Sequence, residues 1–231
     1  MEPMFNTSTY TVPQIVVFGT GCTLWALLYL ILIRNYFRFR FIEMPLAAAA
    51  SNFAWEVLWA VVFTTDMGRF VDLLNKCWLL LDIFIFGAVL HVGVKQLGIE
   101  RLKRHFMGLM LAMMLAFGVG YYWFTRSGFD TATGLTSGLI ANLIISGLYP
   151  VMMLRQPSLD VISPAVGWLK MIGTGLITVF AFMFFPEGQW FIKSMGLAVL
   201  VMDLYYLYLL YDRLRHEAAA KGATGATGSI A

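Results

Sequence analysis

Charged residues are scarce in this chain. Lys, Arg, Asp and Glu make up only 13% of its 231 residues, whereas 60% are hydrophobic, and the mean hydropathy is +0.76. This balance excludes a soluble globular domain and an intrinsically disordered chain. The two cysteines, Cys22 and Cys77, stand far apart in apolar segments, which excludes a disulfide framework or a thiolate metal site. The composition indicates a polytopic membrane protein.

Seven apolar stretches of about 20 residues predict membrane-spanning helices. They cover residues 12 to 33, 44 to 65, 76 to 97, 105 to 125, 132 to 154, 165 to 185 and 189 to 211. We therefore expect an all-α integral membrane protein with a single seven-transmembrane-helix bundle over residues 1–216. Residues 217–231 are dominated by Ala, Gly, Thr and Ser, which predicts a disordered C-terminal tail.

Basic residues are distributed unevenly between the two sides of this predicted bundle. Of the 16 Lys and Arg residues, 12 fall in the first, third and fifth connections or in the tail. Because basic loops stay in the cytoplasm, the N-terminus is predicted to lie outside and the C-terminus in the cytoplasm. The net charge of +3 reflects these loops and indicates no nucleic-acid partner. The host membrane, a bacterial inner membrane or the endoplasmic reticulum, is left open.

Three carboxylates, Glu56, Asp82 and Asp203, lie within the predicted spans and have no Lys or Arg beside them in the sequence. An ionised group in hydrocarbon costs several kcal/mol, so these acids are expected to stay protonated and to serve a functional site. Asn52, Glu56 and Trp59 share one stripe of the second span. Counted from the outer helix ends, the acids lie roughly 13, 9 and 21 Å deep. We expect them to line one elongated cavity that opens toward the outer half.

Unpaired acids in a membrane are also typical of proton-coupled transporters. Such transporters usually contain paired repeats and interrupted helices, and no matching halves are found in this sequence. A retinal protein would need a lysine in the middle of the last span, whereas Lys193 lies at its outer edge. The transporter therefore stays as the alternative, and the retinal protein is rejected.

Two short strings carry a resemblance to a known family. Asn52-Phe53-Ala54-Trp55-Glu56, read together with Met202-Asp203-Leu204-Tyr205, resembles the small integral-membrane terpene cyclases of fungal meroterpenoid and indole-diterpene pathways and their bacterial relatives. The resemblance implies that Glu56 and Asp203 are the catalytic acids. It also implies a linear polyprenyl substrate, often with a terminal epoxide and an aromatic or heterocyclic head group, supplied by an upstream prenyltransferase and epoxidase. It gives Asp82 no fixed role.

The residues themselves also suit a cyclisation that begins with protonation. A neutral carboxylic acid opens an epoxide more readily than it protonates a bare alkene, because the epoxide oxygen is the better acceptor and the ring is strained. Asn52 lies one helical turn from Glu56 and could donate to the carboxylate as it forms. Asp203 would assist the first acid or remove the final proton. No Asp-Asp-x-x-Asp cluster gathers magnesium around a diphosphate, so neither a metal nor another cofactor is expected.

The carbocation that follows must be shielded from water and stabilised by groups that are not nucleophiles. An aromatic face in a dry pocket contributes about 2 kcal/mol of cation–π attraction. The residues that we predict to contact the substrate or the cation are Asn52, Trp55, Trp59, Trp78, Asp82, Tyr205 and Tyr206. Packing and an interfacial belt are the alternative roles of the two tyrosines. Asn52 could equally tie neighbouring helices together.

Overall fold

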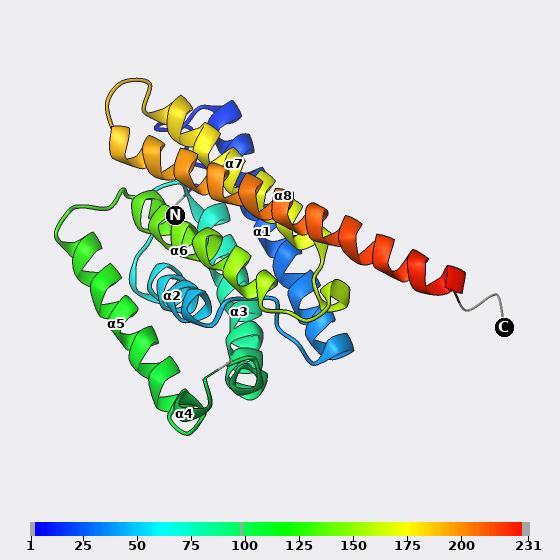
Figure 1. The fold of residues 1–231 in the computed structure, drawn as a ribbon. Coiled ribbons are helices and arrows are strands. Elements are labelled where there is room, and N and C mark those ends of the chain that lie inside the picture. The colour runs from blue at the N-terminus through cyan, green and yellow to red at the C-terminus, as the bar shows by residue number, and fades with distance from the viewer. Residues whose placement is uncertain (1–2, 98, 228–231) are drawn as a thin grey trace.

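The computed structural model describes residues 3–97 and 99–227, and the regular structure within these ranges is helical (Figure 1). In chain order the helices are α1 (Val12–Phe39), α2 (Leu46–Val57), the π-helix η1 (Leu58–Val62), α3 (Arg69–Gln96), α4 (Glu100–Lys103), α5 (Phe106–Arg126), α6 (Leu135–Leu154), the 3₁₀ helix η2 (Leu159–Val161), α7 (Pro164–Phe184) and α8 (Trp190–Thr227). The all-α prediction is confirmed for this part of the chain.

Six of the described helices, namely α1, α3, α5, α6, α7 and α8, are long and apolar enough to cross a membrane. They match six of the predicted spans, and they make the chain a multi-pass membrane protein. The remaining predicted span, 44 to 65, corresponds to a shorter apolar helix, Leu46–Val62. At about 1.5 Å per residue this helix is about 26 Å long, less than the hydrocarbon core of about 30 Å. The count of seven spans therefore stays a prediction.

Helix contacts close most of the bundle into a ring. Each of the pairs α1 with α3, α3 with α2, α2 with α6, α6 with α8, α8 with α7, and α7 with α1 packs together. α5 lies outside this ring and packs mainly against α2 (Figure 1). The sides of α2 therefore face α3, α5 and α6, which explains why a helix of modest length is buried along most of its surface.

Small residues allow α1 and α7 to approach each other closely. A Cβ atom added to Gly21 would lie 2.7 Å from the carbonyl oxygen of Gly173, closer than real Cβ atoms come to another atom. On α2, Ala48, Ala49 and Ala50 are all buried. Without a hydrophobic effect between helices in lipid, such close backbone packing is a main source of association.

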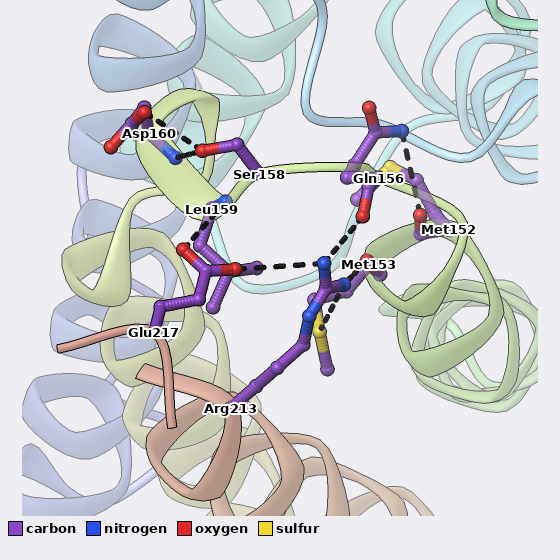
Figure 2. Close-up of polar contacts among 8 residues, drawn as sticks. All are labelled: Met152, Met153, Gln156, Ser158, Leu159, Asp160, Arg213 and Glu217. Carbon is purple, nitrogen blue, oxygen red and sulfur yellow. Dashed lines mark hydrogen bonds and ion pairs between the residues drawn. The ribbon is translucent and has the colours of Figure 1, made fainter. Parts of the chain in front are cut away.

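The C-terminal half of α8 is tied to the α6–α7 connection (Figure 2). Arg213 donates from Nη1 to the Met153 carbonyl at 2.7 Å and from Nη2 to the Gln156 carbonyl at 2.5 Å. Glu217 lies 3.5 Å from the Arg213 guanidinium and accepts from the Leu159 backbone N–H at 3.4 Å. These contacts satisfy carbonyls at the C-terminal end of α6, where a positive charge is favourable.

The last described helix overlaps the predicted C-terminal tail. α8 continues to Thr227, past residue 217, at which a disordered tail is predicted to begin, and this boundary between bundle and tail stays a prediction. Ala218, Ala219 and Ala220 have the highest intrinsic helix propensity, and the contacts of Glu217 hold the preceding turn in place. Residues 228–231 of the predicted tail lie outside the described residues.

Candidate active site

A cavity lies inside the helix ring, enclosed by α1, α2, α3, α6 and α7. Its volume is about 60 Å³. Its lining residues are mostly apolar and aromatic, with a few polar side chains: Phe18, Trp25, Tyr29, Asn52, Trp55, Glu56, Val71, Asn75, Trp78, Thr133, Gly134, Leu135, Gly138, Leu139, Ala141, Asn142 and Ile177. Glu56 is the acidic residue of this set, so the cavity has one carboxyl group in a mostly apolar lining.

The Glu56 carboxyl group is held on one side only. Its side chain is 2% exposed, and its Oε1 atom accepts from the Tyr29 hydroxyl at 2.5 Å and from Asn52 Nδ2 at 3.0 Å. The second of these is the contact that the one-turn spacing predicted. The other oxygen, Oε2, has no hydrogen-bond partner within the described residues. Glu56 therefore lines the cavity with one carboxyl oxygen hydrogen-bonded and the other without a hydrogen-bond partner in the described part of the chain.

Asp82 joins the same polar group from α3, although it does not line the cavity. Its Oδ2 atom accepts from Asn52 Nδ2 at 3.1 Å, and the residue is fully buried. Glu56 and Asp82 thus accept from the same amide nitrogen. Within the described residues, neither acid forms a salt bridge with a basic side chain. Two carboxylates so close together in a dry setting do not both ionise.

Three tryptophans give the cavity its aromatic walls. Each indole N–H is bonded: Trp25 donates to Thr174 Oγ1 at 3.1 Å, Trp55 donates to Ser137 Oγ at 2.8 Å, and Trp78 donates to the Cys22 carbonyl at 3.1 Å. These bonds fix the planes of the rings. Because the donors are already satisfied, the ring surfaces are left as the groups available to a guest in the cavity.

Trp59 lies beside this wall rather than in it. It belongs to the π-helix η1, in which the Phe63 N–H bonds to the Leu58 carbonyl at 2.8 Å, and its ring centroid is 6.1 Å from that of Trp55. Gly134 makes room for it: an added Cβ atom there would lie 2.4 Å from Trp59 Cε2. Trp59 supports Trp55 and is not among the lining residues of the cavity.

Asp203 lies in a second buried cluster, away from the cavity lining. It forms an ion pair with Lys170 of α7, and both side chains are about 1% exposed. Lys170 also donates to Ser146 Oγ at 2.8 Å and lies 5.1 Å from the centre of the Tyr149 ring. The expectation that Asp203 has no cationic neighbour is therefore wrong. Lys170 lies 33 positions before Asp203 in the sequence, and α7, which begins at Pro164, carries it almost two turns into the helix.

Glu43 extends this second cluster into the α1–α2 connection. Its Oε2 atom accepts from the Ser163 N–H at 2.9 Å, and its Oε1 atom accepts from the Tyr206 hydroxyl at 3.5 Å. Tyr149 donates to the Glu43 carbonyl at 2.8 Å. Burial raises the pKa of Glu43 well above its ordinary value. Tyr206 thus belongs to this cluster, while its neighbour Tyr205 is 52% exposed.

The predicted site residues therefore fall into several places. Asn52, Trp55, Glu56 and Trp78 meet at the cavity. Asp82 and Trp59 lie next to residues that line it. Asp203 and Tyr206 lie in the second cluster. The Tyr205 side chain is exposed on the outside of the bundle. Sequence reasoning missed Tyr29, Trp25 and Lys170. No three His, Cys, Asp or Glu side chains come together as a metal site would require, within the part of the chain that was described.

Comparison with known proteins places this site in context. The family model of the Pyr4-like transmembrane terpene cyclases matches residues 3–215. The terpene cyclase spyD of Aspergillus fumigatus is 24% identical over 217 residues, which cover 90% of this chain and 91% of the relative. The terpene cyclase ascF of Acremonium egyptiacum is 24% identical over 224 residues, covering 87% and 81%. No solved structure matches. The chain belongs to the Pyr4-like transmembrane terpene cyclase family.

Proposed function

We propose that this protein cyclises a linear polyprenyl chain by protonating its terminal epoxide, with Glu56 as the acid. The observation that carries the proposal is the unpartnered Oε2 atom of Glu56 at an apolar, aromatic-walled cavity. The transporter alternative gains no support, because both relatives are named as cyclases. An alkene in place of the epoxide would be a weaker proton acceptor, and we therefore place the epoxide first.

The proposed reaction is an isomerisation in which atoms and charge balance. The Glu56 proton passes to the epoxide oxygen, and the bond between that oxygen and the more substituted carbon breaks. The π electrons of the next alkene form a carbon–carbon bond to that carbon and move the cation along the chain. Loss of a proton from the last cation forms an alkene, and the carboxyl group is protonated again. The product has the mass of the substrate.

The aromatic walls supply what this cation requires. The ring surfaces of Trp25, Trp55 and Trp78 attract positive charge without forming a bond to it, by about 2 kcal/mol per ring in a desolvated setting. Water would quench the cation, and the burial of the Glu56 group keeps bulk water out. The contacts of the indole N–H groups hold the rings in place before the substrate arrives.

The cavity is smaller than the proposed substrate. Its volume of about 60 Å³ is well below that of pockets for small organic ligands, which are usually about 300 Å³ or more. Substrate binding must therefore widen the cavity by displacing side chains or helices. We propose that the bundle does so in the membrane, with its N-terminus outside, its C-terminus in the cytoplasm and Leu46–Val62 as the seventh span.

Asp203 is the second acid that the resemblance implies, and its part in the reaction stays a prediction. In this structure Lys170 holds one of its oxygens, and the other has no hydrogen-bond partner within the described residues. If Asp203 assists the acid or removes the last proton, Asp203→Asn should lower the rate strongly or change the products. Wild-type kinetics together with wild-type products would remove Asp203 from the mechanism.

A product assay tests the proposed function. Membranes containing the protein receive epoxidised polyprenyl compounds with several different head groups, and the organic extract is analysed by chromatography and mass spectrometry. We expect an isomer of unchanged mass that is absent from membranes lacking the protein. If no isomer forms from any of the head groups, the proposal is overturned.

A further inference from the structure

Tyr29 is a buried hydroxyl group at the cavity that the family resemblance did not point to. It lies on α1, its side chain is 2% exposed, and it lines the cavity beside Glu56. Its ring packs edge-on against Trp25, with the centroids 6.0 Å apart. The hydroxyl is placed by two hydrogen bonds, one to Glu56 Oε1 and one from Asn52 Nδ2, each 2.5 Å long.

Counting hydrogens shows which way these bonds run. A tyrosine hydroxyl has one hydrogen to donate, and the Asn52 amide has two. Asn52 Nδ2 faces three acceptors: the Tyr29 hydroxyl, Glu56 Oε1 and Asp82 Oδ2. Asn52 Nδ2 donates to the Tyr29 oxygen, and Tyr29 donates its single hydrogen to Glu56 Oε1. That oxygen therefore receives the Tyr29 hydrogen bond whichever of the two carboxylates takes the second amide hydrogen.

This arrangement decides which oxygen of Glu56 carries the acidic proton. A neutral carboxyl group has one hydrogen, and on Oε1 that hydrogen would face the donors that already point at this atom. Oε2 has no partner within the described residues. We infer that Tyr29 is a positioning residue that keeps the proton of Glu56 on Oε2, the oxygen free to donate it to a substrate. The inference rests on the proposed function and names a further residue for it.

The same hydrogen bond contributes most when the proton leaves. Once Glu56 has donated, the negative charge is shared by both carboxylate oxygens, and the Tyr29 bond to Oε1 becomes a hydrogen bond to an ionised acceptor. Such bonds are roughly twice as strong as those between neutral groups. Tyr29 therefore stabilises the transition state more than the ground state, which raises the rate of the chemical step rather than the affinity for the substrate.

The test compares two tyrosine hydroxyl groups. Tyr29→Phe removes the donor to Glu56, whereas the matched control Tyr121→Phe removes a buried hydroxyl that contacts Ser51 at 2.6 Å, outside the cavity lining. We expect Tyr29→Phe to lower kcat by about 100-fold, the usual effect of losing one such donor, with KM changed by less than about twofold. The control should keep wild-type kcat. A Tyr29→Phe variant with wild-type kcat would overturn the inference.

Infrared spectroscopy gives a second measurement that needs no turnover. The C=O stretch of protonated Glu56 is the carboxyl band that disappears in Glu56→Gln. Loss of the donor to Oε1 should move this band to higher wavenumber in Tyr29→Phe and leave it in place in Tyr121→Phe. Should Tyr29→Phe fail to accumulate, 3-fluorotyrosine incorporated into the wild-type chain provides a stronger donor and should move the band to lower wavenumber. An unmoved band in either experiment contradicts the inference, even if no substrate is ever found.

Discussion

Lys170 and Asp203 form an ion pair that joins α7 to α8 inside the bundle, with both side chains about 1% exposed. The pair is surrounded by Ser146 and the Tyr149 ring. A charge left alone in such a place is far more costly than an exposed one. The stability of the bundle should therefore depend on keeping both partners or removing both.

The first prediction concerns this pair. Lys170→Met should lower the midpoint of thermal unfolding in detergent, corresponding to a loss of about 3 kcal/mol, because Asp203 is left without its cation. The double variant Lys170→Met with Asp203→Leu should recover most of that loss. Lys103→Met, which breaks the exposed pair with Glu100, is the control and should change the midpoint little. Equal midpoints for Lys170→Met and Lys103→Met would show that the buried pair is unimportant for stability.

The second prediction isolates the acid. Glu56→Gln keeps the size and the Oε1 acceptor but removes the transferable proton, so product formation should fall below detection while the protein still inserts and folds. Glu43→Gln is the matched control, because Glu43 is also fully buried but belongs to the second cluster. It should retain turnover. Product yield per folded protein, measured for both variants, decides the point, and turnover by Glu56→Gln would remove this residue from the mechanism.

The third prediction concerns the aromatic wall. Trp55→Leu removes a ring that lines the cavity, and a loss of about 2 kcal/mol of cation stabilisation would change the ratio of fully to partly cyclised products by about 30-fold. Trp123→Leu, at an exposed position on α5, should leave the ratio unchanged. Chromatographic product profiles provide the measurement. Identical profiles for the two variants would show that the Trp55 ring does not contact the cation.

The fourth prediction tests the close contact between α6 and η1. Gly134 has a φ of 71°, and an added methyl group would overlap the Trp59 ring. Gly134→Ala should therefore displace the Trp59 ring and lower the unfolding midpoint. Gly108→Ala, where nothing lies within 4 Å of the added atom, should be neutral or slightly stabilising. A midpoint for Gly134→Ala as high as that of Gly108→Ala would contradict the described packing.

Much of the fold follows from local sequence. The length of the apolar stretches predicted both ends of α5, α6 and α7 to within a few residues. It also located α1, α3 and α8, but each of these helices extends beyond its apolar stretch at one end. The helical spacing on the second span predicted that Asn52 and Glu56 would be neighbours, and they are hydrogen-bonded. Both successes depend only on the period and rise of a helix, which the sequence carries directly.

The contacts between helices could not be predicted in the same way. Tyr29 stands between Leu28 and Leu30, where a tyrosine looks like packing, and only the rotation of α1 about its axis turns it toward Glu56. Lys170 lies in the first two turns of its span. Whether its side chain is exposed in a loop or buried in an ion pair depends on the residue at which α7 begins and on the side of α7 that faces α8. Both properties are set by tertiary packing.

The tightness of the cavity has a consequence for selectivity. A cavity of about 60 Å³ is too small for the proposed isoprenoid substrate. Each additional five-carbon unit of the substrate must therefore displace protein side chains or helices. For the proposed polyprenyl substrate, we expect the preference among chain lengths to depend on how easily the surrounding tryptophan side chains and the α6 backbone at Gly138 move aside. Substitution of these lining residues by smaller ones should broaden the range of accepted chain lengths more than it raises the rate for any one substrate.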